Sequence, residues 1–253
     1  MAQRKEERSI ADLIADTAHR KRRAAQARFA GMAPGQESPR DVYLTACAVI
    51  GAYLAESFGF KYLKSGPHAR RKSGDFTFQI SFQSDRNNIP GERVGMWIHG
   101  NVLHGADYIA GGQIGNLQVN HCWLDWELVD VTNRDELVRD AIGAIEELAL
   151  PYFAKFEDLP SLFKLLVNED LPAMSIDRVV EFLMRFADQS TARLAASSFL
   201  KRRPDLIGAF RRDFERYAAS GLDSQHPSGY AQQLAFASYA FKFGDLALQV
   251  APL

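Results

Sequence analysis

Strict alternation of apolar and polar side chains marks one segment of this chain as a β-strand. Between residues 75 and 83, every second residue is large and apolar, and the residues between them are polar. Because successive side chains of a strand point to opposite faces, this pattern predicts one buried face and one polar face. The buried set is Phe76, Phe78, Ile80 and Phe82, and the polar set is Thr77, Gln79, Ser81 and Gln83.

Two later segments alternate in the same way and are predicted to be strands of the same sheet. The residues expected to point inward are Val94, Met96 and Ile98 in segment 93–99, and Cys122, Leu124, Trp126 and Leu128 in segment 119–130. Short strands are also expected at 60–63 and near Arg70, and the glycine-rich segment 111–115 is expected to be a flexible loop. The connections are short, which favours an antiparallel meander.

Helical periodicity dominates the rest of the chain. Ser38-Pro39 is a typical helix start and Gly59 a typical helix end, and an apolar stripe lies between them at Tyr43, Cys47, Ile50, Leu54 and Phe58. An earlier helix is predicted over residues 4–29, and another begins at Asn133 and is expected to be interrupted by Pro151. Shorter helices are predicted at 158–167, 175–188, 190–201, 204–219 and 229–242.

These elements predict an α+β fold, in which an antiparallel meander sheet packs with an N-terminal helix and a C-terminal set of helices. We expect three regions. Residues 1–37 form a basic helical extension, residues 38–168 form the sheet domain, and residues 169–253 form a helical region packing on that same domain.

Charge and composition indicate where the protein is located more than what its activity is. The 253 residues carry a formal net charge of −1, so no global charge favours a nucleic acid or a membrane surface. No apolar run is long enough for a membrane span, and a secretory signal is not recognisable at the N-terminus. Cys47 and Cys122 lie in apolar stretches and are expected to be reduced and buried. We therefore expect a cytoplasmic protein.

The charges are unevenly spread along the chain. Residues 1–30 carry eight Lys or Arg and four Asp or Glu, a net of +4, whereas residues 119–188 carry 6 and 15, a net of −9. The basic run Arg20, Lys21, Arg22 and Arg23 is a candidate for binding nucleic acid. A solvated helix end is the more ordinary interpretation, because cations suit the helix C-terminus.

The polar side of the predicted sheet contains the candidate binding residues. A solvent-facing side would normally carry Lys, Glu and Thr, but this one carries two tryptophans and two histidines. Either the C-terminal helices cover it and the tryptophans belong to a core, or it binds a protein or ligand with the tryptophans as anchors. The candidate residues are Gln79, Gln83, Trp97, His99, His121, Trp123, Asp125 and Glu127.

Known catalytic patterns are not found in the sequence. His99, His104 and His121 could approach one another with Asp125 to bind a metal ion, but their spacing matches no established metal motif. Segment 111–115 lacks the Lys and Ser/Thr of a phosphate-binding loop. Cys122 and its neighbour His121 would point to opposite faces of a strand, which argues against a nucleophile–base pair. We predict no catalytic residue, no metal and no cofactor.

Residues 45–166 resemble a bacterial family known as domain-of-unknown-function family 4304. The resemblance depends on an ordered set of features. These are the segment Phe58-Gly59-Phe60-Lys61, the basic Arg70-Arg71-Lys72, the strand 76–84, the strand 94–98, the segment Trp123 to Glu127, and a helix ending in Leu150-Pro151-Tyr152-Phe153 followed by Leu159 and Leu162. The resemblance implies an α+β fold in a bacterial cytoplasm and assigns no activity.

Three functional hypotheses follow. The first is a non-catalytic binding protein whose partner is another protein, by analogy with immunity proteins or antitoxins. The second is a metal-dependent or other enzyme that uses the His, Trp and Asp side chains of the polar sheet face. The third is a nucleic-acid-associated protein that uses Arg20 to Arg23, together with Arg70 to Lys72.

Overall fold

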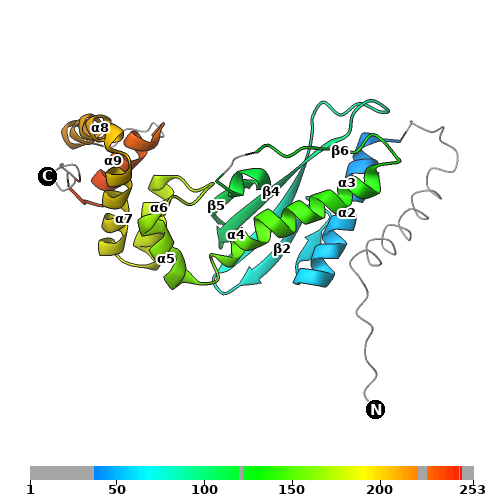
Figure 1. Ribbon diagram of the computed structural model, residues 1–253, viewed down its shortest axis with the longest axis horizontal. Helices are drawn as coiled ribbons and strands as arrows, with labels where there is room; N and C mark the ends of the chain where they lie inside the picture. The colour runs from blue at the N-terminus through cyan, green and yellow to red at the C-terminus, as the bar shows by residue number, and fades with distance from the viewer. Residues whose placement is uncertain (1–36, 120–121, 222–226, 245, 247–253) are drawn as a thin grey trace, which may run out of the picture. The chain divides into compact units, whose positions relative to one another are not determined.

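The computed structural model describes residues 37–119, 122–221, 227–244 and 246 (Figure 1). The chain divides into two compact units, Met1–Phe153 and Ala154–Leu253, so the second unit begins earlier than the predicted boundary after residue 168. The predicted helix 4–29 and its basic run Arg20 to Arg23 lie outside the described residues. No helix in the described part of the chain is long and apolar enough to cross a membrane.

Helix α2 (Pro39–Phe58) matches the prediction at both ends. Pro39 occupies the first turn, and Gly59 takes the left-handed conformation (φ 70°) that ends the helix. The Ser38 side chain makes no capping hydrogen bond, although its carbonyl accepts the first amide bonds of the helix. The predicted apolar stripe faces inward, with Cys47, Ile50 and Leu54 fully buried.

An antiparallel sheet forms the centre of the first unit, as predicted. Its strands follow one another in space in the order β1-β2-β3-β4-β5, and β6 also pairs with β4. The strands are β1 (Lys61–Leu63), β2 (His68–Ser73), β3 (Phe76–Ser84), β4 (Gly95–His104), β5 (Asp107–Gln113) and β6 (Trp126–Glu127).

The strand predicted over residues 119–130 is wrong for most of its length. Of the residues of this segment that the structure describes, Trp126–Glu127 alone pairs with β4, and Cys122, expected to be buried, is exposed. The edge of β4 is instead occupied by β5, which runs through the glycine-rich segment that we expected to be a loop. After β5 the chain leaves the sheet as the 3₁₀ helix η1 (Ile114–Leu117) and returns to the same edge as β6.

Gly111 of β5 is explained by close backbone approach. Gly111 has φ 132°, and a Cβ atom there would lie 2.2 Å from the carbonyl oxygen of Gly100 on β4. Only glycine combines this conformation with this separation. Gly111 is therefore compatible with a strand here, because the backbone of β4 leaves no space for a side chain at this position.

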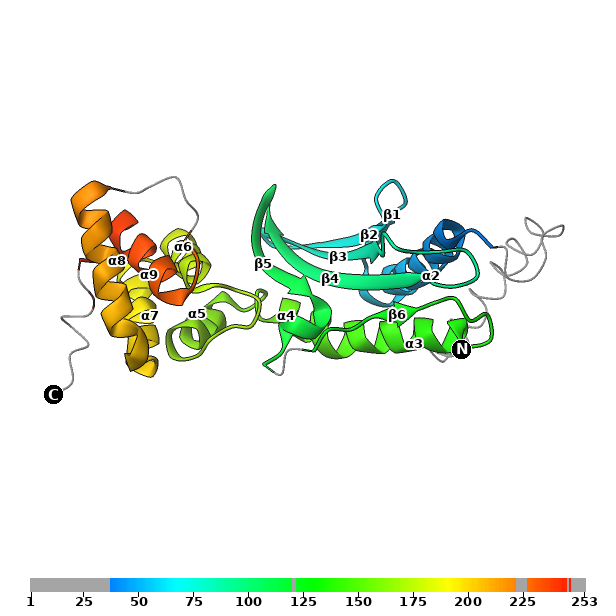
Figure 2. The same cartoon turned by 90° about the horizontal axis from the view of Figure 1, so that it is seen from above.

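The helices of the first unit cover one face of the sheet (Figure 2). Helix α3 (Arg134–Ala144) continues through a π-helical turn, η2 (Ile145–Ala149), into α4 (Leu150–Ala154). The Phe78 and Phe153 rings stack with centroids 4.9 Å apart and planes 8° apart. A Cβ atom on Gly100 would lie 3.5 Å from Ala149 and 3.4 Å from Phe153, so helix and sheet pack closely.

Pro151 does not interrupt the helix as predicted. Proline has no N–H and crowds the carbonyl four residues earlier, and here the π-helical turn immediately precedes it. Pro151 has no N–H to donate to the carbonyl of Glu147. This carbonyl instead accepts a hydrogen bond of 3.4 Å from the Gln118 side chain. The wider turn and this external donor allow the helix to continue.

The second unit is helical in its described part. The predicted helices are confirmed within a few residues, with α7 capped by Asp188, whose side chain accepts from the Thr191 amide. The helices are α5 (Leu159–Asn168), α6 (Ile176–Phe186), α7 (Gln189–Arg202), α8 (Ile207–Ser220) and α9 (Tyr230–Ala240), with the 3₁₀ turn η3 (Pro204–Leu206) before α8.

Substitution of Gly111 tests the close packing of β4 and β5. We expect Gly111→Ala to lower the free energy of unfolding by more than about 2 kcal/mol, because the methyl group would collide with a backbone carbonyl. Gly143→Ala in α3 is the matched control, since no atom lies within 4 Å of its Cβ position and alanine should stabilise the helix by about 0.5–1 kcal/mol. Urea unfolding measures both, and equal effects would contradict the explanation.

Candidate binding face

The sheet of the first unit has one face that its own described helices leave uncovered. Figure 2 shows α2 and α3 on one side of the sheet and no helix of residues 37–153 on the other. We call this second side the open face. Its residues, placed by strand alternation, by cross-strand register and by the contacts described below, are Lys61, His68, Arg70, Lys72, Thr77, Gln79, Ser81, Gln83, Asp85, Arg93, Trp97, His99, Asn101, Trp123, Asp125 and Glu127.

A chain of hydrogen bonds crosses the middle of the open face. Arg70 Nε donates to Gln79 Oε1 at 2.6 Å, and Gln79 Nε2 donates to Ser81 Oγ at 2.6 Å. Asn101 Nδ2 lies 3.4 Å from the same Ser81 oxygen. These bonds connect three adjacent strands, so the polar side chains are held in place.

Two tryptophans form an apolar patch near the acidic end of the open face. Trp97 on β4 lies opposite Gln83 of β3, and Trp123 approaches it from the segment that leads to β6. The two rings meet edge to face, with centroids 5.6 Å apart and planes at 74°. Trp123 is 60 % exposed. Trp126 is different, because it is buried on the core side and its Nε1 donates to Asp140 at 2.8 Å.

Three ring nitrogens on the open face are buried and have no hydrogen-bond partner among the described residues. They are Trp97 Nε1, His99 Nε2 and His68 Nε2. Trp97 lies close enough to Asp125 to favour its ionised form, but outside hydrogen-bonding geometry. Burial lowers the pKa of His99 below its ordinary value, so the imidazole is neutral near pH 7. Unpartnered polar atoms of this kind are uncommon in folded proteins.

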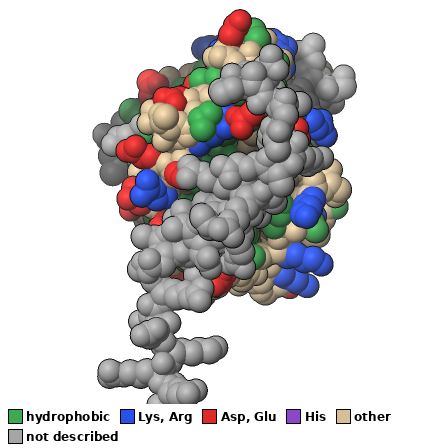
Figure 3. Space-filling view, turned by 90° about the vertical axis from the view of Figure 1, so that its right-hand side faces the viewer, with side chains coloured by type: hydrophobic (Ala, Val, Ile, Leu, Met, Phe, Trp, Pro, Cys, Tyr) green, Lys and Arg blue, Asp and Glu red, His purple; other side chains and the backbone are tan. Residues whose placement is uncertain are grey.

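Charge is unevenly distributed on the surface of the first unit. Figure 3 shows a group of Lys and Arg side chains along one side of the view and more Asp and Glu side chains on the other, with both signs present on each side. Positive and negative side chains are also separated on the open face. Its β1–β2 end carries Lys61, Arg70 and Lys72, whereas its other end carries three carboxylates around one arginine.

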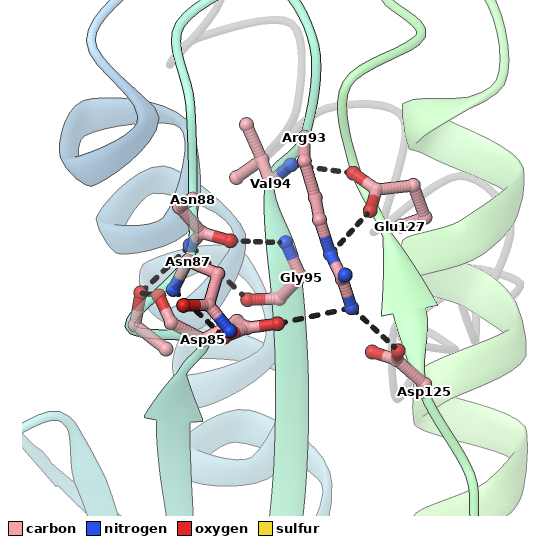
Figure 4. Close-up of polar contacts among 9 residues, drawn as sticks. Asp85, Asn87, Asn88, Arg93, Val94, Gly95, Asp125 and Glu127 are labelled. Atoms are coloured by element: carbon pink, nitrogen blue, oxygen red, sulfur yellow. Dashed lines mark hydrogen bonds and ion pairs between the residues drawn. The ribbon is translucent and has the colours of Figure 1, made fainter.

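Arg93 is the centre of that acidic end (Figure 4). Its guanidinium lies 3.0 Å from Asp85 Oδ2, 3.8 Å from Asp125 Oδ2 and 3.6 Å from Glu127 Oε2. Gly95 lies between two of these carboxylates, because a Cβ atom there would lie 3.2 Å from Asp85 Cβ and 3.6 Å from Asp125 Oδ1. The absence of a side chain at position 95 therefore lets the carboxylates converge.

The loop before β4 is fastened to the same cluster. Asp85 Oδ1 accepts from the Asn87 amide at 2.8 Å, and Asn88 Oδ1 accepts from the Gly95 amide at 2.7 Å. Glu127 Oε1 accepts from the Val94 amide at 2.5 Å. These bonds hold both ends of the 85–94 loop and thereby position Arg93.

One arginine does not neutralise three carboxylates. Burial raises the pKa of Asp125 above its ordinary value, Arg93 opposes the rise, and the charges of Glu127 and Asp85 add to it. The acidic end of the open face is therefore held under repulsion, with a formal excess of two negative charges over the guanidinium.

Most predicted binding residues lie on the open face. The structure brings together Gln79, Gln83, Trp97, His99, Trp123, Asp125 and Glu127, whereas His121 lies outside the described residues. Asp85 and Asn88 were missed because they belong to a predicted loop whose fold depends on distant partners. Among the described residues, no group of three or more His, Cys, Asp or Glu side chains is arranged to hold a metal ion.

No family model, curated protein or solved structure matches this chain. The resemblance of residues 45–166 to the domain-of-unknown-function family therefore stays a prediction. The geometry of the open face is the basis for the functional proposal that follows.

Removal of Arg93 should destabilise the first unit. Arg93→Gln leaves Asp85, whose side chain is only 4 % exposed, without its cation, and we expect a loss of about 1–3 kcal/mol in the free energy of unfolding. Arg86→Gln removes the same charge from an exposed position of the same loop and should change stability by less than about 0.5 kcal/mol. Urea unfolding compares them, and similar stabilities would show that the cluster contributes little.

Proposed function

We propose that this chain is a non-catalytic binding protein and that its open face contacts another protein. The observation that supports this most directly is the Trp97–Trp123 pair, of which Trp123 is 60 % exposed and lies beside buried ring nitrogens without partners. A partner that covered Trp123 would bury its exposed apolar area.

Physical chemistry favours binding over chance exposure. Single exposed apolar side chains are common and need no explanation. Here a tryptophan is paired with a second tryptophan on a rigid strand, so covering it costs little conformational entropy. Tryptophan is also among the residues most often found at the centres of protein interfaces.

The enzyme hypothesis has less support from the described residues. His99 and Asp125 share the open face, but Asp125 pairs with Arg93. Ser81 is the cross-strand neighbour of His99, but its hydroxyl accepts hydrogen bonds from Gln79 and Asn101, and His99 Nε2 has no hydrogen-bond partner among the described residues. A binding role uses the exposed tryptophan directly, so we prefer it.

Site-specific photocrosslinking tests the proposal. A photoreactive amino acid replacing the exposed Gln83, which is opposite Trp97, should give a covalent adduct with another polypeptide in cells that produce the protein. The same amino acid replacing the exposed Arg139 on α3 serves as the positional control and should give none.

A second pair of variants tests whether the adduct depends on Trp123 or on any exposed apolar side chain. Trp123→Ala should reduce the Gln83 adduct at least fivefold, whereas Leu194→Ala, which removes a 53 % exposed apolar side chain from α7, should leave it unchanged. An equal adduct from Arg139, or a Gln83 adduct insensitive to Trp123→Ala, would contradict the proposal. Circular dichroism spectra verify that the variants are folded.

A further inference from the structure

The β1–β2 hairpin is unusually basic for an element at the edge of a sheet. Residues 57–74 include Lys61, Lys64, Arg70, Arg71 and Lys72 and contain no Asp or Glu. Arg71 has a structural role, because its guanidinium lies 5.4 Å from the centroids of both the Phe60 and Phe78 rings. The remaining four cations are exposed.

Three of these exposed cations share the open face. Register places Lys61 beside Arg70, Arg70 beside Gln79, and Lys72 beside Thr77. Among the described residues, no ion pair joins Lys61, Arg70 or Lys72 to a carboxylate, and Arg70 makes its hydrogen bond to a neutral amide. Their charge is therefore available to a partner.

The opposite end of the face limits what that partner can be. A nucleic acid is negative along its whole length, and its bases would have to reach Trp123 beside Asp125, Asp85 and Glu127, which exceed the charge of Arg93. A polypeptide can be acidic at one point and neutral at another. The separation of charge on the open face thus favours a protein segment over a nucleic acid.

Sheet geometry sets the spacing that such a segment needs. Arg70 is in register with Gln79 and Asn101, and Trp97 lies four residues along β4 from Asn101. With about 3.3 Å per residue along a strand and about 4.8 Å between strands, Arg70 and Trp97 are roughly 16 Å apart at the backbone. An extended segment covers that distance in about five residues.

We propose that the open face binds an extended acidic segment of a partner protein. Acidic residues of the segment lie over Lys61, Arg70 and Lys72, and an apolar side chain about five residues away packs against Trp97 and Trp123. This inference rests on the proposed function and specifies the partner's chemistry.

A designed peptide tests the inference. The probe carries a fluorescent label, one leucine, four serines and three glutamates, so that the leucine and the first glutamate are five residues apart. Fluorescence anisotropy with the full-length protein should show binding that weakens as salt is raised. A peptide with one serine should bind at least threefold more weakly, and a peptide with three lysines in place of the glutamates should show no binding.

Charge variants locate the site of binding. The triple variant Lys61→Gln/Arg70→Gln/Lys72→Gln should weaken binding of the probe at least fivefold. Lys155→Gln/Lys201→Gln/Arg212→Gln removes the same charge from exposed positions of the second unit and should have little effect. Equal losses in the two triple variants, or no binding of the probe at 1 mM, would overturn the inference.

Three further outcomes distinguish the interpretations. Tighter binding of a labelled ten-nucleotide oligothymidylate than of the probe, lost in the Lys61/Arg70/Lys72 variant, would overturn the inference in favour of a nucleic acid. If the probe fails but the Gln83 adduct persists in that same variant, the open face binds a protein without an acidic segment. If the Gln83 adduct is already absent from the protein that retains all three cations, the proposed function fails.

Discussion

The stacking of Phe78 on Phe153 determines which side of the sheet becomes the core of the first unit. The two rings lie nearly parallel, 4.9 Å apart, and they join the central strand to the end of the α3–η2–α4 helix. Gly100 lies close beneath the same helix, so β4 also approaches it closely. Because a strand alternates its side chains, this packing leaves Gln79, Ser81 and their neighbours on the other side. The open face is therefore a direct consequence of where the aromatic core forms.

The sequence predicted the parts of the fold that depend on local pattern. Alternation from Phe76 to Phe82 located β3 and its faces, and Gly59 located the end of α2, because both signals act over a few neighbouring residues. The strand over residues 119–130 was wrong because Cys122 and Leu124 alternate as strand residues do, yet β5 already occupies that edge of β4. The fold of β5 depends on the fit of Gly111 against Gly100. This contact joins two strands and cannot be recognised from a pattern of neighbouring residues.

The candidate site was predicted in part for the same reason. Trp97, His99 and Gln83 followed from strand alternation, and the structure places them on one face. Trp123 and Asp125 were also placed on that face, but by a strand that does not form. They reach it because the chain returns from η1 to the edge of β4. Asp85 and Asn88 could not be predicted, because their partners Arg93 and Gly95 are brought to them only when the loop closes.

Two opposed charge clusters and an aromatic pair share the open face, and each has a separate structural origin. Arg93 holds three carboxylates together at one end, and the β1–β2 hairpin presents unpaired cations at the other. The tryptophans lie beside the acidic end because β6 delivers Trp123 against Trp97. A surface with this order of charges and aromatic rings distinguishes between the two directions in which a chain can lie across it. This property suits recognition of a polypeptide.

Binding through the open face requires that Trp123 is accessible to solvent in the free protein. Fluorine NMR of protein labelled with 5-fluorotryptophan gives one resonance for each of the three tryptophans, assigned by Trp→Phe variants. The shift of each resonance between H₂O and D₂O reports its exposure. The account predicts the largest shift for Trp123 and almost none for Trp126, which is 2 % exposed. A Trp123 shift as small as that of Trp126 would contradict the account, because the open face would then be covered by the chain itself.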